Sequence, residues 1–554
     1  MKTEFDLLHD KMVFDFLDLY PTTASYLGLK KYNDRCEINI SKTHILKEEK
    51  LVNKYLTDLK KIKEKIKDEK QKMNCLACIL ILKDMKKVID SELLVRSKTK
   101  EKITNIPYSL LPLNQMDSPI QFIIDTINED YYKIKEDDDF KDLISKIKEF
   151  NKWFEVAIEN MRLGMKKNIV LPKVIANEVL KQLLCYRKDK SYLKLIEKSK
   201  KVNDSFLNKF KNLYEKEFLK ELELFIDFFK NEYLNNCRDS ISINEIVNNN
   251  IYKNIIKSYD INLDANKIHE IGIKEVNRIN NLIKKIMKKL NFNGTVDEFH
   301  EKMKKDKNNL YKKGSELKTD IIKYKKLFDK EVVKKQFNIF PSSDYVIKKF
   351  NEDVSENLPC GSYLPGSIFG PKRKGIFYMN SIVMSPKYDV PSLVLHEGNP
   401  GHHFQATISQ DSKKINFITI FHPNIIIPYD EGWGLYVEGL YEYEDLMLEY
   451  GKLNSELFRA VRLVVDTGIH EKKWSREKAV NYMKNNLGHG DGEIESEVNR
   501  YIADPGQSLC YKIGQMQILK LKKEFLKKNN DVKEFHKKFL ENGEIPLSLL
   551  KLYF

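Results

Sequence analysis

The segment HEGNPGHH (396–403) gathers side chains that could hold a metal ion and activate water. Hydrolytic zinc is bound by histidine nitrogens and a carboxylate, with one position left for water. The zinc-peptidase pattern His-Glu-x-x-His places its histidines four residues apart, about one helical turn, and its glutamate is the general base. His396 and Glu397 match the start of that pattern, but the fourth residue after His396 is Pro400. The segment is either a metal site with an insertion or a histidine cluster that only resembles one.

The later histidines cannot join His396 on an undistorted helix. On an ideal α-helix, His402 lies about 120° around the axis from His396, and His403 lies about 10 Å along it. Pro400 removes a backbone donor and clashes with the preceding turn, and Gly401 adds conformational freedom. A bulge that absorbs two extra residues would return His402 to the place of an ordinary second ligand, and such bulges occur often at functional sites.

The octapeptide resembles the His-Glu-x-x-Pro-Gly-His-His signature of a bacterial family catalogued as domain of unknown function 885, which belongs with the gluzincin-type zinc peptidases. The resemblance covers nearly the whole chain, in FDFLDLYPTTASYLGLKKYND (14–34), GIFYMN (375–380), YDEGWGLYVEGL (429–440), RAVRLVVDTGIHEKKW (459–474) and EVNRYIADPGQSLCYKIG (497–514). It implies a mainly α, two-lobed gluzincin-type peptidase fold with a small antiparallel β-sheet beside the active-site helix. It also implies one Zn²⁺ per chain.

The resemblance suggests the ligands of that ion as well. Related peptidases have Gly-His before the second ligand, which favours His402; His403 is the alternative, and otherwise supports the site or contacts substrate. The third ligand is expected on the next long helix, where Glu431 lies 29 residues after His402. Taken alone, Glu431 could equally be an acid in a first helical turn, favoured by the helix dipole.

Neighbours of Glu431 fit the ligand interpretation. Gly432 and Gly434 would let another helix approach closely. Glu438 lies two turns further on the same face, where it could orient a ligand from behind or simply be solvated.

A polar stripe lies on the apolar helix predicted at 452–473, at Arg459, Arg462, Asp466 and His470. Asp466 is four residues from both Arg462 and His470 and could bridge them. A carboxylate that holds an imidazole fixes its tautomer, so His470 could contact a substrate or an oxyanion. A buried structural network is an equally good explanation.

Amide hydrolysis also needs a donor for the developing oxyanion. Tyr501 and Tyr511 flank a turn at 504–507, and we slightly favour Tyr511. Arg500 and Gln507 could contact a substrate carboxylate.

Two parts with different composition must position these residues. Residues 1–340 hold only 5 of the 22 glycines and read as long amphipathic helices, whereas 6 of the 11 histidines lie between 396 and 489. We predict a helical part, 1–340, forming one wall of a cleft, and a catalytic part, 341–554, with a soft boundary. In the second part, YVIKKF (345–350) and GIFYMNSIV (375–383) are predicted strands, and Tyr378 and Asn380 of an edge strand could bind an extended peptide. Later helices are predicted at 388–410, 429–446, 452–473, 476–487, 492–503 and 506–528.

Composition and charge argue against several classes of protein, among them membrane-spanning and disulfide-stabilised proteins. No apolar run reaches about 18 residues, so we expect no membrane span. The opening MKTEFDLLHDKMVFDFL carries acids inside its apolar part and predicts no secretory signal, hence a cytoplasmic location. The net charge of +15 could indicate a nucleic-acid partner, but the lysines alternate with acids along helices, as on solvated faces. The seven cysteines do not suggest a disulfide framework.

The sequence therefore predicts a zinc-dependent peptidase acting on short peptides, with Glu397 as general base. The alternatives are a metal-dependent hydrolase of another amide, a metal-binding protein with little turnover, and, less favoured, a basic helical protein that binds nucleic acid or a partner. Whether residues are removed from either end or bonds are cut inside the peptide stays open.

Overall fold

The computed structural model describes residues 2–97, 103–116, 118–129, 131–246, 250–350, 359–370, 373–411 and 416–554, and these are mainly α-helical. Close contacts divide the chain into two compact units. The first unit is Met1–Asn254, Ser367–Lys372 and Ile502–Asp504, and the second is Ile255–Gly366, Arg373–Tyr501 and Pro505–Phe554. Residues 255–340, which the sequence groups with the first part, thus belong to the second unit; the predicted cleft wall stays a prediction. No helix in the described ranges is long and apolar enough to span a membrane.

The first unit is built from helices and short 3₁₀ or π turns. In chain order they are α1 (Glu4–Leu19), α2 (Pro21–Tyr26), η1 (Lys30–Tyr32), α3 (Lys42–Ile62), η2 (Lys63–Lys65), α4 (Glu69–Val95), η3 (Tyr108–Leu110), α5 (Pro119–Ile127), α6 (Asp137–Lys167), α7 (Lys173–Lys188), α8 (Ser191–Lys198), α9 (Asp204–Leu213), η4 (Tyr214–Phe218), α10 (Leu219–Phe228), η5 (Phe229–Tyr233), η6 (Leu234–Asn236) and η7 (Ile243–Glu245). Helix α11 (Ile251–Ser258) crosses into the second unit.

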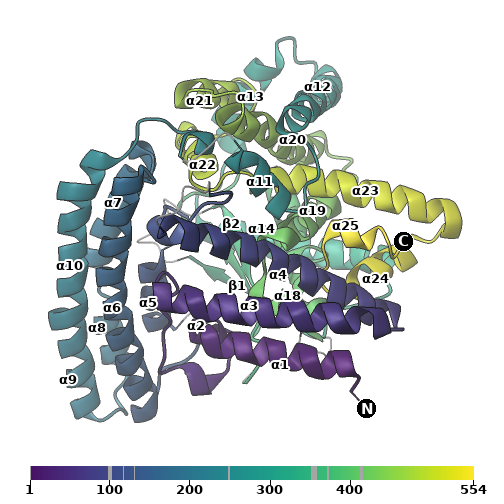
Figure 1. Ribbon diagram of the computed structural model, residues 1–554. Helices are drawn as coiled ribbons and strands as arrows, with labels where there is room; N and C mark the ends of the chain where they lie inside the picture. Colours follow the sequence, from purple (N-terminus) through teal and green to yellow (C-terminus); the bar gives the residue numbers. More distant parts are fainter. Residues whose placement is uncertain are drawn as a thin grey trace. The chain divides into compact units, whose positions relative to one another are not determined.

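Two helical layers make up this unit. Helices α1, α3 and α4 lie side by side, as do α6, α7 and α10 (Figure 1). The second layer closes over aromatic side chains, among which the buried Trp153 contacts Phe150, Phe154 and Phe225. The burial of such rings is the main favourable term in the packing of these amphipathic helices.

The second unit carries the sheet and the remaining helices. They are α12 (Ala265–Lys289), α13 (Val296–Lys305), η8 (Lys307–Asn309), α14 (Gly314–Phe328), η9 (Asp329–Val333), α15 (Lys334–Gln336), β1 (Val346–Lys349), β2 (Gly361–Leu364), β3 (Ile376–Met379), α16 (Val390–Glu397), α17 (His402–Asp411), α18 (Phe417–Phe421), η11 (Asn424–Ile426), α19 (Ile427–Glu438), α20 (Leu446–His470), α21 (Arg476–Lys484), α22 (Asp491–Ala503), α23 (Leu509–Asn529), α24 (Val532–Leu540) and α25 (Leu547–Leu550).

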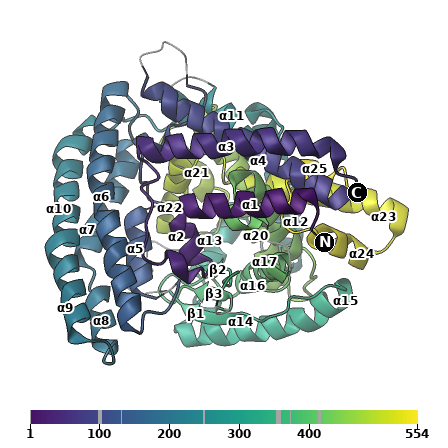
Figure 2. The ribbon, with the colours of Figure 1, turned by 60° about the horizontal axis from the view of Figure 1, so that its bottom comes forward.

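The three described strands form one small sheet in the order β1-β3-β2, next to α14 and α16 (Figure 2). Strand β3 pairs parallel with β1 and antiparallel with β2. The prediction of an antiparallel sheet was therefore wrong, and the sheet is mixed. The prediction of 375–380 as an edge strand was also wrong, because β3 is central and hydrogen-bonded on both sides. It has no free edge to which a peptide strand could be added.

Helix α19 is the element around which the second unit packs. Almost all of its side chains are buried, and it lies against α23 and α16. Trp433 and Tyr429 of α19 stack on Phe539 of α24, with ring centroids 4.9 and 4.7 Å apart. Because α19 is held on several sides, the polar side chains that it carries have fixed positions.

Candidate metal centre

The predicted helix 388–410 is interrupted. Helix α16 ends at Glu397, α17 begins at His402, and four non-helical residues lie between them. Side chains from outside hold this link: Trp433 Nε1 donates to the Pro400 carbonyl oxygen at 2.8 Å, and Asn399 Nδ2 donates to Asp329 Oδ1 at 2.9 Å. The expected bulge is thus a complete break, because Pro400 has no N–H with which to continue the helix.

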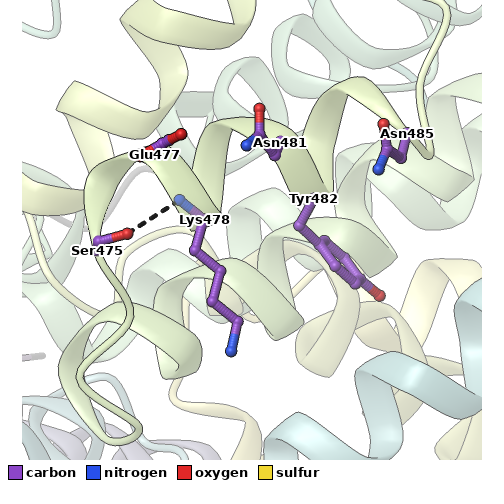
Figure 3. A pocket seen from close by; sticks show the side chains of 6 residues that line it. All are labelled: Ser475, Glu477, Lys478, Asn481, Tyr482 and Asn485. Atoms are coloured by element: carbon purple, nitrogen blue, oxygen red, sulfur yellow. Dashed lines mark hydrogen bonds between the residues drawn. The ribbon is translucent and has the colours of Figure 1, made fainter.

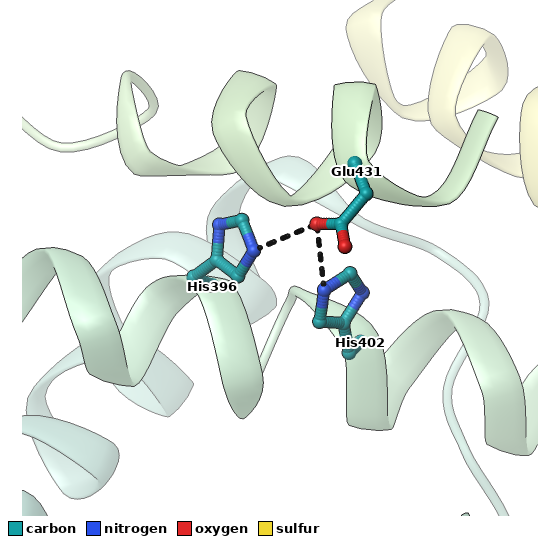
Figure 4. Close-up of side chains that lie close together, drawn as sticks. All are labelled: His396, His402 and Glu431. Atoms are coloured by element: carbon teal, nitrogen blue, oxygen red, sulfur yellow. Dashed lines mark hydrogen bonds and ion pairs between the residues drawn. The ribbon is translucent and has the colours of Figure 1, made fainter. Parts of the chain in front are cut away.

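The break brings His402 beside His396. Their rings are nearly perpendicular with centroids 4.6 Å apart, and Glu431 of α19 lies next to both (Figure 4). Glu431 Oε2 is 3.3 Å from His396 Nε2 and 3.4 Å from His402 Nε2. One ligand atom from each of the three side chains lies within 4.8 Å of the others.

This donor set suits one zinc ion. In a tetrahedral site with zinc–ligand distances of about 2.0–2.1 Å, ligand atoms are about 3.4 Å apart. The 3.3 and 3.4 Å separations agree with that spacing. Two imidazoles and one carboxylate also leave a fourth position for water, the ligand count typical of catalytic zinc. The assignment of these residues as ligands stays a prediction.

Helix α19 holds the His396 ring between two carboxylates. Glu431 faces Nε2, and Glu438 Oε1 lies 2.8 Å from Nδ1. Gly434 sits between these two glutamates, where a Cβ atom would lie 2.5 Å from His396 Cε1. Two residues earlier, a Cβ atom on Gly432 would lie 2.5 Å from the backbone of Gly514 in α23. Gly434 therefore leaves space for the His396 ring, and Gly432 leaves space for the close approach of α23.

The charges in the cluster stabilise one another. Burial alone would raise the pKa of Glu431, but its contacts with His396 and His402 hold that pKa well below the usual value. Burial disfavours protonated His396, yet Glu431 and Glu438 together raise its pKa to about 9. Burial likewise opposes ionisation of Glu438, and the nearby Arg459 and His396 lower its pKa overall. Both carboxylates are thus ionised at neutral pH and offer negative charge to a cation.

Glu397 is the last residue of α16 and is only 8% exposed. It directly follows His396 in the chain and lies beside the cluster. Among the described residues its carboxylate has no hydrogen-bond or ion-pair partner. Its oxygens are therefore not engaged by a described protein donor.

His403 lies in separate surroundings. Its Nε2 donates to the carbonyl oxygen of Ser343 at 3.1 Å, so its Nδ1 accepts from the Tyr363 hydroxyl at 3.0 Å. Burial lowers its pKa to about 4, which keeps the ring neutral. Both nitrogens are used in linking α17 to β2 and to the loop before β1. Of the two adjacent histidines, His402 is therefore the one placed at the cluster.

Tyr511 of α23 also borders the cluster. Its ring is almost parallel to that of His396, with centroids 6.2 Å apart, and its hydroxyl accepts from Arg500 Nη2 at 3.3 Å. Gln507 Oε1 accepts from the same Arg500 nitrogen at 2.8 Å. Burial and the charge of Glu431 raise the pKa of Tyr511, so its hydroxyl keeps its proton at neutral pH.

The other predicted site residues build a buried network. Tyr501 donates to Glu497 at 2.8 Å and accepts from Arg462 Nε at 3.2 Å. His470 Nε2 donates to the Tyr501 carbonyl oxygen at 2.8 Å. Asp466 accepts from Gly506 N and Ser508 Oγ, which holds the turn before α23. Their described partners are protein groups, as in the structural interpretation.

Tyr378 and Asn380 likewise have partners in their own surroundings. Tyr378 stacks on Phe350, with ring centroids 5.1 Å apart. Asn380 is fully buried, accepts from the backbone of Ile382 and Val383, and donates to the Pro359 carbonyl oxygen. Their predicted contact with a peptide stays untested.

Two supporting residues escaped the sequence analysis. Ser455 donates to Glu438 Oε2 at 2.5 Å, and Glu497 pairs with Arg462 at 2.9 Å. Ser455 stands four residues before Arg459, so the polar stripe on α20 could have been extended to it. Glu497 stands three residues before Arg500 on α22, a spacing that also signals an ion pair.

A surface hollow lies apart from these residues, along α21 (Figure 3). It is lined by Ser475, Glu477, Lys478, Asn481, Tyr482 and Asn485. Ser475 caps the helix by accepting from Lys478 N. None of the predicted site residues lines it.

Comparisons place the chain among proteins without assigned function. Residues 21–552 match the family described as "Bacterial protein of unknown function (DUF885)". Among curated proteins, none matches the chain. A crystal structure from Colwellia psychrerythraea, described as a candidate lipoprotein, is similar with a TM-score of 0.86 and 25% identity over 99% of this chain and 97% of that one. A Shewanella oneidensis protein, described as a candidate lipoprotein of unknown function, has a TM-score of 0.75 and 17% identity over the full length of both chains.

Proposed function

We propose that this chain, which belongs to the bacterial family of unknown function DUF885, is a zinc-dependent peptidase that hydrolyses short peptides. One observation carries the proposal. Two histidine nitrogens and one carboxylate oxygen converge within 4.8 Å, and a fourth side chain, the acidic Glu397, lies beside them without a described protein partner. No described protein group uses the Glu397 carboxylate, so it is available to water or a substrate beside the cluster.

The proposed metal ligands are His396, His402 and Glu431, through the atoms that already face one another. A zinc ion held there would act as a Lewis acid toward water and the carbonyl oxygen of an amide. Glu438 fixes the His396 tautomer by accepting from Nδ1, which leaves Nε2 to face the metal.

Glu397 is the proposed general base. Its carboxylate would accept a proton from the water that attacks the carbonyl carbon, and would return it to the amide nitrogen as the C–N bond breaks. Tyr511, whose raised pKa keeps its hydroxyl protonated, could donate a hydrogen bond to the developing oxyanion.

Limited exposure of the site favours short peptides. The side chains of His402 and Glu431 are each 19% exposed, and that of His396 is 5% exposed. Backbone in a folded surface could not reach such recessed groups, whereas an extended peptide could.

Metal content and turnover together test the proposal. We expect about one zinc per chain in protein purified without chelator, and its loss in His396→Ala and Glu431→Ala. Glu397→Gln should keep the metal and lose at least a hundredfold in hydrolysis of a mixed short-peptide pool. Glu477→Gln, on the exposed face of α21, is the matched control and should change neither.

The outcomes separate the alternatives. Absence of metal, even after zinc is supplied, would remove the proposal. Bound zinc without peptide turnover would favour the hydrolysis of another amide or a metal-binding role. Turnover that survives Glu397→Gln would contradict the assigned general base.

A further inference from the structure

Three arginines gather beside the candidate metal centre, all around Tyr511. Arg459 and Arg462 come from α20, with guanidinium carbons 5.8 and 4.4 Å from the centroid of the Tyr511 ring. Arg500 comes from α22 and donates to the Tyr511 hydroxyl at 3.3 Å. Guanidinium groups repel one another, so their gathering around one ring calls for negative charge nearby.

The carboxylates within ion-pair distance are too few. In the described part of the chain, Glu497 serves both Arg462 at 2.9 Å and Arg500 at 3.5 Å. Arg459 has only Glu438, at 3.6 Å, and that carboxylate also accepts from His396 and Ser455. Three cations therefore share two anions, one of which belongs to the support of the metal centre.

The hydrogen bonds of the three arginines are incomplete as well. Each arginine has one buried N–H group without an acceptor among the described residues: Arg459 Nε, Arg462 Nη1 and Arg500 Nε. Buried donors of charged groups are normally satisfied, because leaving them unpaired forfeits their hydration. These unpaired donors leave the positive charge of the cluster under-compensated, and a small anion with several oxygen atoms at the exposed side of the guanidinium groups would offset it.

The arginines remain accessible to such an anion. The side chains of Arg500 and Arg459 are 20% and 16% exposed, comparable to the proposed zinc ligands. Gln507 holds Arg500 in place through the 2.8 Å hydrogen bond from Nη2. A planar guanidinium held in this way matches a carboxylate with two parallel hydrogen bonds.

Tyr511 links the arginines to the metal centre. One face of the ring lies over His396, and its hydroxyl touches Arg500. An extended peptide advances about 3.3–3.6 Å per residue. A carboxylate on Arg500, separated from His396 by one aromatic side chain, would therefore lie within a few residues of an amide at His396 and Glu431.

We propose that Arg500, supported by Arg459 and Arg462, binds the C-terminal carboxylate of the peptide substrate, so that the enzyme is a carboxypeptidase. The inference rests on the proposed peptidase function and extends it to a substrate class. The carboxylate of a side chain offers the same chemistry, so the test must separate the two sources.

Binding to Glu397→Gln protein gives a readout without turnover. The probes are three pools of randomised hexapeptides with an N-terminal fluorophore: free acids, C-terminal amides, and amides whose last residue is Glu. Fluorescence anisotropy should show the free acids binding at least tenfold more tightly than both amide pools. Arg500→Gln should reduce this preference to less than threefold, while Arg476→Gln, a partly exposed arginine on α21 that bonds Asn499, should keep it.

Each contrary result overturns the inference. Equal binding of acids and amides would exclude a carboxylate site, and tight binding of the Glu-ending amides would assign the arginines to an acidic side chain. Should Arg500→Gln fail to fold, Arg500→Lys keeps the charge but loses the paired geometry, and should weaken free-acid binding severalfold. An unchanged preference in Arg500→Lys would then also count against the inference.

Product analysis distinguishes this inference from the peptidase proposal. Mass spectrometry of wild-type digests should show N-acetylated free acids shortened from the C-terminus, and the matching amides spared at least tenfold. Zinc-dependent cleavage of both at equal rates would leave the peptidase proposal standing and remove the carboxylate site. Absence of bound metal would instead remove the peptidase proposal.

Discussion

Glu438 Oε1 lies 2.8 Å from His396 Nδ1, and this single contact determines which nitrogen of the ring faces Glu431. Because Nδ1–H donates to Glu438, Nε2 is the atom that is left for a metal ion. Ser455 in turn holds the other oxygen of Glu438 at 2.5 Å, so the support extends from α16 through α19 to α20.

Removing this support should weaken metal binding without removing a ligand. We expect Glu438→Gln to lower zinc affinity by about 10- to 100-fold, the usual effect of losing a carboxylate behind a histidine ligand. Competition with a chromophoric chelator measures the affinity. Glu442→Gln, an exposed glutamate just beyond the same helix, is the control. An unchanged affinity in Glu438→Gln would mean that His396 is not held as a ligand.

Metal binding should depend on pH through His396. Its pKa is raised to about 9 in the metal-free protein, so the ring is protonated at pH 7 and must lose that proton to bind zinc. Affinity should therefore rise by about tenfold per pH unit from pH 7 towards pH 9 and level off above it. Glu431 adds no pH dependence in this range, because its pKa is well below the usual value.

Calorimetry in buffers of different ionisation enthalpy measures the released proton directly. About one proton should be released per zinc at pH 7, after allowance for ionisation of the zinc-bound water. The increase of zinc affinity with pH should be smaller in Glu438→Gln, where His396 loses one of the two carboxylates that raise its pKa. A zinc affinity that does not change with pH in the wild type would contradict the idea that zinc displaces a proton from His396.

The proximity of His396, His402 and Glu431 could be anticipated from local information. A proline in the middle of the predicted helix 388–410 rules out a regular helix, and the resemblance supplied the distance to Glu431. The way in which the helix is interrupted could not be read from the sequence, because it depends on Trp433 and Asp329, which hold the link from distant elements.

The sheet shows the same limit. The strands at 346–349 and 376–379 are indicated by their β-branched and aromatic residues, but their pairing is not. Parallel or antiparallel pairing depends on the path of the intervening chain and on which edge is covered, and neither leaves a local pattern. The arginine network is equally non-local, since Glu497 and Arg462 stand on different helices.

Gly434 should be essential because of the space it leaves. A Cβ atom there would lie 2.5 Å from Cε1 and 2.8 Å from Nε2 of His396. We expect Gly434→Ala to displace the ring and lower zinc affinity by more than tenfold, although alanine favours the helix by about 1 kcal/mol. Metal content and the melting temperature measure the two effects. Gly439→Ala is the control, because a Cβ there meets its nearest atom only at 3.4 Å. Full zinc occupancy in Gly434→Ala would contradict the proposed ligand position.

The adjacent histidines should separate into two roles. His402→Ala should abolish zinc binding and leave the fold intact, because its side chain is partly exposed and its described ion-pair partner is Glu431. His403→Ala should keep zinc but lower the free energy of unfolding by about 2 kcal/mol, because the fully buried His403 side chain and its hydrogen bonds to Ser343 and Tyr363 are lost. Elemental analysis and urea denaturation provide the two readouts, each variant serving as the control of the other. Folded His403→Ala protein without zinc would transfer the ligand role to His403, and would require the link between α16 and α17 to take a different course from the one described.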